Sequence, residues 1–396
     1  MELEQRITNA NEYLLFMKNM KFKHVHVVAF DLPFPPNYGG STDMYFKLVH
    51  LQKLGISVTL HVFLYDGKEK APDLEKVTFK TIYYSRKRYK NPFFGKIPYI
   101  VKTRKNEELF QNLLLDNSPI LFEGLHTTYY INHPLIKDRI RVVRAHNVEH
   151  NYYSALEQAE DNFFKKIFFM IEAERLRKYE SVLHEVNSIA GISPAETNYL
   201  NKAYGNTEYI PAFHSNTDVF SRLGKGEFVL YHGNLSVPEN NRAALYLVEE
   251  VFPLVKRPCV VSGSNPSKKL IKAISKYDHI TLRANIPTKE ILELIESAHV
   301  NAMVTFQSTG IKLKLLNSLY RGRFVVANSH MVKETQVEDL CYISDKSVEY
   351  ASLIEDCFMQ DFTEVEKAKR IIILSQLFNN HENAIKLAKM LQLEIN

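Results

Sequence analysis

Short apolar runs alternate with longer stretches of helical periodicity along the first part of the chain. The runs are KHVHVVAF (23–30), ISVTLHVFL (56–64), PILFEG (119–124) and RVVRAHN (141–147). Each of them leads into a polar loop or a helical stretch. Apolar strands that alternate with helices are typical of parallel α/β domains. This part of the chain therefore predicts a Rossmann-like sheet covered by helices.

Helices are predicted between these strands. One covers MYFKLVHLQKLG (44–55), a long one covers roughly 155–187, and a third covers PAETNYLNKAYG (194–205). Further strands are expected at NSIAGIS (187–193) and near EYIPAF (208–213).

The same pattern restarts after the polar, turn-rich segment 211–226. Strand, loop and helix units follow at 227–255, 258–274, 279–298 and 300–319, with a last apolar run at 323–329. The chain thus predicts two Rossmann-like domains, at 1–210 and 211–380, and a carboxyl-terminal helix at 381–396 that packs back on the first domain. Ligands of such sheets bind beyond the carboxyl ends of the strands. We therefore expect an α/β protein whose two domains face each other across a cleft.

The composition restricts where in the cell the protein is expected. The 396 residues are 45% hydrophobic and 24% charged, and the three cysteines have no metal-ligand spacing. No apolar run reaches the length of a membrane span, and the first residues do not resemble a signal peptide. We expect a cytoplasmic protein, with peripheral contact to the inner face of a membrane as a further option.

Positive charge is concentrated in the stretch 83–108, which places eight Lys or Arg residues between 86 and 105 among aromatic side chains. Two interpretations remain open. The stretch is a solvated surface, or it meets phosphates of an anionic membrane or an anionic substrate. No nucleic-acid recognition motif accompanies it, so we expect no nucleic-acid partner.

Several motifs together resemble glycosyltransferase family 4, the retaining nucleotide-sugar enzymes of the GT-B fold. The second half contributes GSNPSKKL, ITLRANIP and STGIKLKLLNSLYRGRFVVAN, and the first half contributes LPFPPNYGGSTD and RAHNVEHNYY. The second-half motifs look like the donor-binding half of enzymes of bacterial polysaccharide synthesis. The resemblance implies transfer of a sugar from a nucleotide-sugar donor to a glycan or lipid-linked acceptor, with retention. It also implies no metal or other cofactor, and no Asp-x-Asp sequence is present.

The family's signature, two Glu residues separated by seven positions, is altered in this chain. In register, its positions hold Thr309 and Asn317. The resemblance implies that Thr309, Gly310 and Ile311 offer backbone N–H groups to the sugar or phosphate. Asn317 would contact the nucleotide ribose as a neutral partner, with less strength than a carboxylate.

Two lysines, Lys312 and Lys314, are predicted in the first turn of the helix that starts at Thr309 and Gly310. A helix N-terminus already carries about half a positive charge, so two cations there suggest an anion. In a family 4 enzyme that anion would be the leaving nucleoside diphosphate. Residues i and i+2 do not share a helix face, so we expect one lysine to reach it. Lys312, nearer the helix start, is the predicted catalytic cation and Lys314 a second donor-side residue; the alternative is two solvated lysines.

Glycine and amide residues follow the predicted strands in both halves. Gly39 and Gly40 would let the backbone approach a phosphate or sugar, although a Gly-Gly pair is often only a turn. The other predicted donor-binding residues follow strands of the second half: Gly233, Asn234, Ser262, Gly263, Asn285 and Ile286.

A histidine follows the strand 119–124. The resemblance implies that His126 touches the donor sugar or the reaction centre, with Glu123 as the reserve.

The stretch RAHNVEHNYY also contains the order H-x-x-E-H at His146, Glu149 and His150, as in an inverted zinc-peptidase motif. That motif requires one helix face, whereas His146 ends an apolar strand. We therefore place His146, Asn147 and Glu149 on the acceptor side and predict no metal. The competing hypotheses are a catalytically degenerate GT-B protein that binds glycan or nucleotide and, third, a zinc hydrolase.

Overall fold

The computed structural model describes residues 22–395 apart from 66, 90, 94, 161 and 307–311. These residues form two compact units. The first unit holds the chain up to Phe213 and again from Asn380, and the second holds His214–Asn379.

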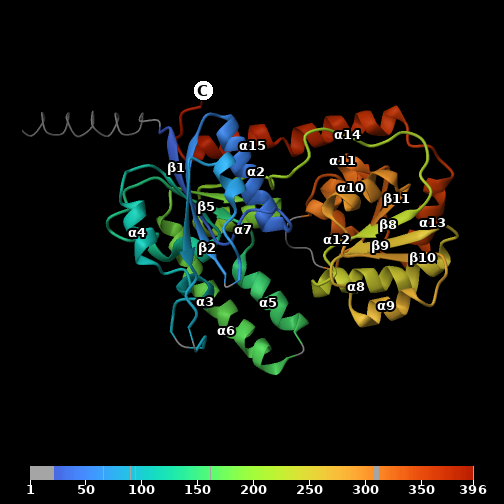
Figure 1. Cartoon of the computed structure of the whole chain (residues 1–396), viewed down its shortest axis with the longest axis horizontal. Helices are drawn as coiled ribbons and strands as arrows, with labels where there is room; N and C mark the ends of the chain where they lie inside the picture. The colour runs from blue at the N-terminus through green and yellow to red at the C-terminus, as the bar shows by residue number, and fades with distance from the viewer. Residues whose placement is uncertain are drawn as a thin grey trace, which may run out of the picture. The chain divides into compact units, whose positions relative to one another are not determined.

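The first unit is built on a parallel sheet of seven strands in the order β3-β2-β1-β4-β5-β6-β7 (Figure 1). Every strand pair in it is parallel. The strands are β1 His24–Ala29, β2 Ser57–Leu64, β3 Lys80–Ser85, β4 Ile120–Glu123, β5 Arg141–Ala145, β6 Ser188–Gly191 and β7 Thr207–Tyr209.

Helices cover both faces of this sheet. They are α2 Gly39–Lys53, α3 Tyr99–Lys102, α4 Glu107–Leu113, α5 Glu149–Ala159, α6 Phe163–Tyr179, α7 Pro194–Tyr204 and α15 Asn380–Met390, with 3₁₀ helices at Pro72–Lys76, Leu125–Tyr130 and Glu180–Glu185. Neighbouring strand residues point to opposite faces. Val27 thus packs with α2 and α15, whereas Val28 packs in the second core with α4 and α7.

The second unit has a parallel sheet of six strands in the order β10-β9-β8-β11-β12-β13. Its strands are β8 Val229–His232, β9 Cys259–Gly263, β10 Ile280–Ala284, β11 Val300–Met303, β12 Phe324–Ala327 and β13 Tyr342–Ile343. Its helices are α8 Pro238–Tyr246, α9 Lys268–Ile274, α10 Thr288–Ser297, α11 Leu313–Arg321, α12 Ser329–Val332, α13 Ser347–Phe358 and α14 Glu364–Leu377. A π-helical turn, Leu247–Val251, and two 3₁₀ helices, Phe252–Leu254 and Glu338–Leu340, complete it.

Both sheets reverse their strand order once, between β1 and β4 and between β8 and β11. In open α/β sheets, such a reversal leaves a crevice at the carboxyl ends of the two strands. The loops that follow these strands are therefore where a site is expected in each unit.

The predicted α/β class with two Rossmann-like domains is confirmed, but several elements differ from prediction. α2 begins at Gly39 rather than at residue 44, so the Gly-Gly pair is the first turn of a helix. The stretch predicted as one helix over 155–187 contains two helices, because Glu160 is extended and the side chain of Asn162 caps α6 by accepting a hydrogen bond from the Lys165 N–H. β3 and β13 were not predicted.

The unit boundaries lie close to the predicted domain limits, with a small shift. Arg144 donates hydrogen bonds to the carbonyls of Ile210 and Pro211, and the Phe213 N–H donates to Asp43. These bonds attach residues 210–213 to the first unit. At the other end α15 packs on α2, whereas α14 belongs to the second unit.

None of the helices in the described ranges combines the length and the apolar run needed to span a bilayer.

Candidate active site

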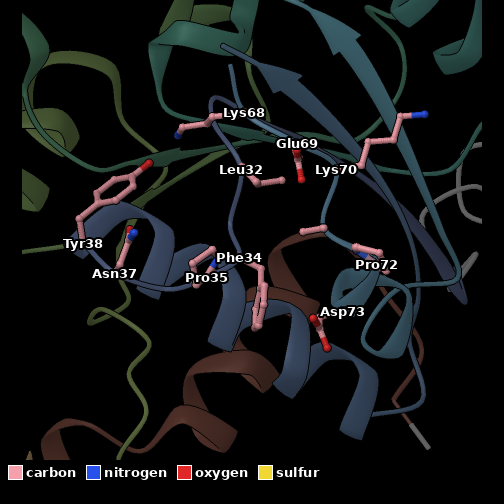
Figure 2. A pocket seen from close by; sticks show the side chains of 11 residues that line it. Leu32, Phe34, Pro35, Asn37, Tyr38, Lys68, Glu69, Lys70, Pro72 and Asp73 are labelled. Carbon is pink, nitrogen blue, oxygen red and sulfur yellow. The ribbon is translucent and has the colours of Figure 1, made fainter. Parts of the chain in front are cut away.

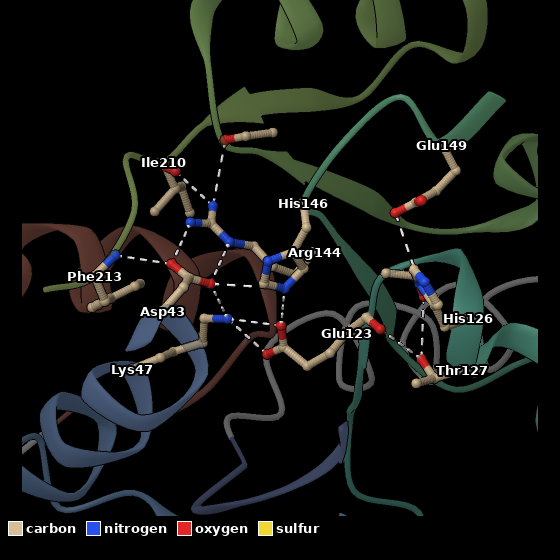
Figure 3. A network of polar contacts seen from close by, with 12 residues as sticks. Asp43, Lys47, Glu123, His126, Thr127, Arg144, His146, Glu149, Ile210 and Phe213 are labelled. Atoms are coloured by element: carbon tan, nitrogen blue, oxygen red, sulfur yellow. Dashed lines mark hydrogen bonds and ion pairs between the residues drawn. The ribbon is translucent and has the colours of Figure 1, made fainter. Parts of the chain in front are cut away.

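A buried ionic network lies at the carboxyl ends of β4 and β5 in the first unit (Figure 3). Lys47 Nζ lies 2.9 Å from Asp43 Oδ2 and 2.7 Å from Glu123 Oε1. Arg144 Nη2 lies 2.8 Å from Asp43 Oδ1, and His146 Nε2 lies 2.8 Å from Glu123 Oε2. All five side chains are buried. The network therefore joins α2 to the two central strands.

The two carboxylates of this network are ionised despite their burial. Burial raises the pKa of Asp43, but Arg144 and Lys47 outweigh it and hold that pKa well below the usual range. Burial is likewise outweighed for Glu123, where Lys47 and His146 lower the pKa. Glu123 is thus fully engaged within the fold, which argues against its reserve role in catalysis. Asp43, Glu123 and His146 could gather round a cation, but the ammonium of Lys47 already binds both carboxylates.

A second polar pair, His126 and Glu149, lies beside this network (Figure 3). His126 lies in the 3₁₀ helix after β4 and stacks against Phe30, with ring centroids 5.1 Å apart. Glu149 is the first residue of α5, and its Oε1 lies 3.7 Å from His126 Nδ1. Within the described residues, neither atom has a hydrogen-bond partner. This distance is too long for a hydrogen bond but is closed by a small movement.

The environment makes both members of the pair neutral near pH 7. Burial, together with the nearby Glu196, raises the pKa of Glu149 to about 8, although Asn147 opposes the shift with a hydrogen bond. Burial and the charge of Arg104 hold the pKa of His126 well below its ordinary value. A protonated carboxyl beside a neutral imidazole can donate a hydrogen bond to Nδ1, which leaves the ring proton on Nε2. The pair is therefore suited to holding one imidazole tautomer.

The H-x-x-E-H residues do not form a zinc site. His146 binds Glu123, whereas His150 Nδ1 lies 2.8 Å from Glu180 Oε2. Among the described residues that could gather round a cation, His146, Glu149 and His150 do not form one group.

Gly40 serves packing at the start of α2. A Cβ there would come within 2.9 Å of the Phe30 ring and 3.0 Å of the Tyr38 ring. Gly40 thus lets the Phe30 ring, which packs against His126, lie close to the helix start.

A pocket of about 410 Å³ adjoins this helix start (Figure 2). Lys68 Nζ lies 2.7 Å from Asp31, and the Tyr38 hydroxyl donates to Asp31 over 3.0 Å. These contacts join the loop after β1 to the loop after β2. The pocket is lined by Leu32, Phe34, Pro35, Asn37, Tyr38, Lys68, Glu69, Lys70, Ala71, Pro72 and Asp73. Sequence reasoning missed it, since its walls come from two separate loops.

In the second unit, the loops after β8, β9 and β10 are tied together by amide side chains. The Oδ1 atom of Asn234 accepts a hydrogen bond of 2.9 Å from Ser264 Oγ. The Asn265 N–H donates over 2.8 Å to Asn285 Oδ1, and the Asn285 N–H donates over 3.0 Å to the Gly263 carbonyl. Asn265 and Asn285 have φ values of 51° and 56°. Three of the predicted donor residues therefore define the shape of one loop cluster.

Gly263, the last residue of β9, is required because the backbone of Gly233 lies directly against it. A Cβ at Gly263 would overlap the carbonyl oxygen of Gly233, whereas one at Gly233 would meet only ordinary contacts from 3.4 Å. Ser262 is buried, and its hydroxyl donates to the Arg283 carbonyl over 3.0 Å. Ser262 therefore supports the strands rather than lining a cavity. Ile286 is half-buried beside Asn285.

The two lysines near α11 have different environments. In the described residues α11 begins at Leu313, with Lys312 at its N-cap position and no side-chain cap. Lys314 Nζ lies 2.9 Å from Asn240 Oδ1 and 3.3 Å from the Val304 carbonyl. Burial lowers the pKa of Lys314, with Glu239 opposing. Its ammonium ties α11 to α8, so the alternative of two solvated lysines does not hold for Lys314, and its donor-side role stays a prediction.

The remaining residues of the altered signature are only partly described. Asn317 Oδ1 accepts a hydrogen bond of 2.9 Å from Asn216 Nδ2. Thr309, Gly310 and Ile311 lie outside the described residues. Sequence reasoning missed Glu239, which accepts hydrogen bonds from the Thr305 hydroxyl and the Phe306 N–H. Its position just after Pro238, at a helix start, was the available signal.

Comparisons with known proteins agree with this architecture. Residues 226–358 match the family model "Glycosyl transferases group 1". A relative from Klebsiella pneumoniae, described as an uncharacterized 44.6 kDa protein in the cps region, is 27% identical over 325 residues, which cover 76% of this chain and 82% of the relative.

Solved structures resemble nearly the whole chain. Sucrose-phosphate synthase from Thermosynechococcus elongatus superposes with a TM-score of 0.67 at 15% sequence identity. The match covers 93% of this chain and 98% of the synthase chain. Anabaena HepE, solved with UDP and glucose, superposes with a TM-score of 0.60 at 13% sequence identity. The match covers 93% of this chain and 99% of the HepE chain. These likenesses show the fold, and the family match covers most of the second unit. The chain thus has the two-domain GT-B fold of these structures, and residues 226–358 of its second unit match the group 1 glycosyl transferase model.

Proposed function

We propose that the protein transfers a sugar, with retention, from a nucleotide-sugar donor to a glycan or lipid-linked acceptor in polysaccharide synthesis. The observation that carries the proposal is the loop cluster after β8, β9 and β10, held rigid by Asn234, Asn265 and Asn285 within the part that matches the family. The relative from a cps region supports a polysaccharide product. Retention rests on the resemblance to family 4.

The donor nucleotide is proposed to be a uridine diphosphate, as in the HepE complex. Its diphosphate would bind at the N-terminus of α11, where backbone N–H groups and the helix dipole favour an anion. Lys312, at the N-cap, would add a full positive charge where negative charge develops on the leaving oxygen. Asn317 uses its carbonyl oxygen on Asn216 and would offer its amide N–H to the ribose.

In the first unit, His126 is proposed to contact the transferred sugar through Nε2. Glu149, protonated near pH 7, would donate its hydrogen bond to Nδ1 and so keep the imidazole proton on Nε2, which would donate to an oxygen of the sugar. The proposal includes no metal. Activity that is unchanged by a chelator would support this part, and activity restored only by a divalent ion would refute it.

Nucleotide binding tests the donor assignment. A ligand selective for the folded state raises the melting temperature, so UDP at about 1 mM should raise it more than GDP or ADP. Absence of a shift with all three nucleotides would contradict the donor site. The configuration of the new glycosidic bond, measured by NMR, tests retention directly.

Substitution of each lysine in turn distinguishes a catalytic charge from a structural contact. Lys312→Ala should lower kcat roughly a hundredfold, because it removes a charge that acts most in the transition state. Lys314→Ala should instead lower the melting temperature, because it removes the half-buried link to Asn240. The reverse pattern would place the diphosphate on Lys314.

The second candidate is a degenerate GT-B protein that binds nucleotide without turnover. Thr309 and Asn317 favour it, since both signature acids are missing. A UDP-dependent melting shift without hydrolysis or transfer from a panel of UDP-sugars would select this alternative.

A further inference from the structure

The first half of α6 carries apolar side chains that the fold does not bury. Between residues 163 and 171, seven of nine residues are apolar, and none of the nine is buried. Burial in α6 begins only at Glu172. Phe163 is 68% exposed, and Phe164 is 75% exposed. A helix of a globular protein normally turns such residues to the core, so this set of exposed and half-buried apolar residues indicates an interaction surface.

The shape of the first unit presents this surface at the end of a projection. α5 and α6 pack against each other as a helical hairpin that extends away from the sheet (Figure 1). Phe163 and Phe164 are the first two residues of α6, at the tip of the hairpin. These two side chains can therefore insert into a binding partner without displacing any part of the core.

A neighbouring loop continues the apolar surface. Arg175 Nη1 donates a hydrogen bond of 2.8 Å to the Pro92 carbonyl, which holds the loop against α6. The Phe93 ring, 43% exposed, lies with its centroid 6.3 Å from that of Phe168. Phe168 is one helical turn from Phe164, so Phe93 and the tip lie on one continuous surface. We define the hairpin surface as residues 163–171 together with Phe93, Lys96 and Ile97.

The charges of the hairpin surface are positive. The only polar residues between 163 and 171 are Lys165 and Lys166, both exposed, and the loop adds exposed Lys96. Each helix lysine has one long ion pair of 3.9 Å, Lys165 with Glu160 and Lys166 with Glu157, and both lysines keep exposed side chains. Phenylalanines beside lysines on one exposed helix are the combination that binds the interface of an anionic bilayer.

The basic stretch predicted from the sequence contributes only in part. Arg104 is buried, and its guanidinium donates to the carbonyls of Phe30 and Ile100. Arg86 lies over the Tyr65 ring at 4.4 Å and donates to Thr103. These two cations make contacts within the fold, so the basic stretch is not exposed along its whole length. The unpredicted part of the surface is the apolar tip.

We propose that the hairpin surface docks the protein on an anionic phospholipid bilayer. Phe163 and Phe164 enter the headgroup region, and Lys165, Lys166 and Lys96 lie against the lipid phosphates. This binding is independent of which sugar is transferred and of whether the protein has turnover.

Vesicle co-sedimentation of the full chain tests the proposal. The protein should pellet with phosphatidylcholine vesicles that contain about one third phosphatidylglycerol, less with pure phosphatidylcholine, and less at high salt, because surface attraction is screened over about 8 Å at physiological salt. Phe163→Ser with Phe164→Ser should weaken binding roughly tenfold or more, because both rings lose their apolar contact. Lys165→Glu with Lys166→Glu should remove the preference for anionic vesicles.

The matched control is Leu115→Ser with Leu135→Ser, two leucines of the same unit that are 75% and 65% exposed. This variant should bind vesicles like the parent chain. All variants change exposed side chains, so equal melting temperatures verify folding. Vesicle binding that survives the phenylalanine change overturns the proposal. A second outcome also overturns it. If the parent chain does not bind vesicles but is a dimer by sedimentation velocity, and the phenylalanine change makes it a monomer, the surface binds a second copy of the chain.

Discussion

Buried carboxyl groups of the first unit differ in charge because their partners differ. Asp43 and Glu149 are both removed from water. Burial raises the pKa of both, but Arg144 and Lys47 reverse the effect for Asp43, whose pKa lies below its usual range. Glu149 has the neutral His126 and Asn147 beside it, so burial dominates and its pKa rises to about 8. A buried acid therefore stays charged only where cations meet it directly.

Glu149 should make stability depend on pH. Its pKa rises from an ordinary 4.5 to about 8 in the folded state. Between these values the folded state holds a proton that the unfolded state has lost, so the free energy of unfolding falls as pH rises, by up to about 1.4 kcal/mol per pH unit. Glu149→Gln should remove this contribution and flatten the curve. Urea unfolding of both proteins between about pH 5 and pH 8 measures it. Parallel curves would mean that Glu149 is ionised in the fold.

At the scale of elements, single residues in the connections decide how neighbouring elements are arranged. Asn162 divides a continuous helical pattern into α5 and α6 and so creates the hairpin. In the second unit, Gly263 allows the loops after β8 and β9 to touch through their backbones. In each case one residue acts locally: Asn162 through its side-chain cap and Gly263 through its missing Cβ.

Substitution of neighbouring glycines tests the loop cluster. Gly263→Ala should destabilise the second unit by about 1–3 kcal/mol, since the added methyl overlaps the Gly233 carbonyl and the loop must shift. It should also reduce the UDP-dependent melting shift. Gly233→Ala is the control, because its Cβ would meet ordinary contacts from 3.4 Å. Equal melting temperatures of the two variants would show that the loops move apart without cost.

At the scale of the whole molecule, the chain returns to its first unit at the end. α15 places Ala384, Leu387 and Ala388 in the core formed with β1, β2 and α2. The first unit is thus closed by residues that follow the entire second unit. Its stability depends on a segment more than 150 residues distant in sequence from Phe213.

Truncation of one α15 side chain should affect the first unit selectively. Leu387→Ala removes a fully buried side chain and should cost about 2–5 kcal/mol. Amide hydrogen exchange should become faster in β1 and β2, while β8 and β9 keep their protection. Leu115→Ala is the control, because that leucine is 75% exposed. Faster exchange in both sheets after Leu387→Ala would mean that the units unfold together.

The sequence alone determined the α/β class, the two sheets and the resemblance to glycosyltransferases. Apolar runs and helical periods are local, and a motif is carried by adjacent residues, so both can be read along the chain. β3 was missed because KTIYYS, at the edge of its sheet, is only partly buried and lacks an apolar run. The Gly-rich and amide-rich loops were predicted at their positions, but not the contacts that hold them.

Only the tertiary structure decided the state of individual side chains. Asp43 and Arg144 lie 101 residues apart in sequence but form one ion pair, and Lys314 meets Asn240 across 74 residues. Whether a lysine is solvated or buried, and whether a glutamate is charged, depends on groups that folding brings from distant elements. The exposed phenylalanines of α6 illustrate the same limit. Their pattern predicts a helix, but only the packing of the unit shows that its described residues leave Phe163 and Phe164 exposed.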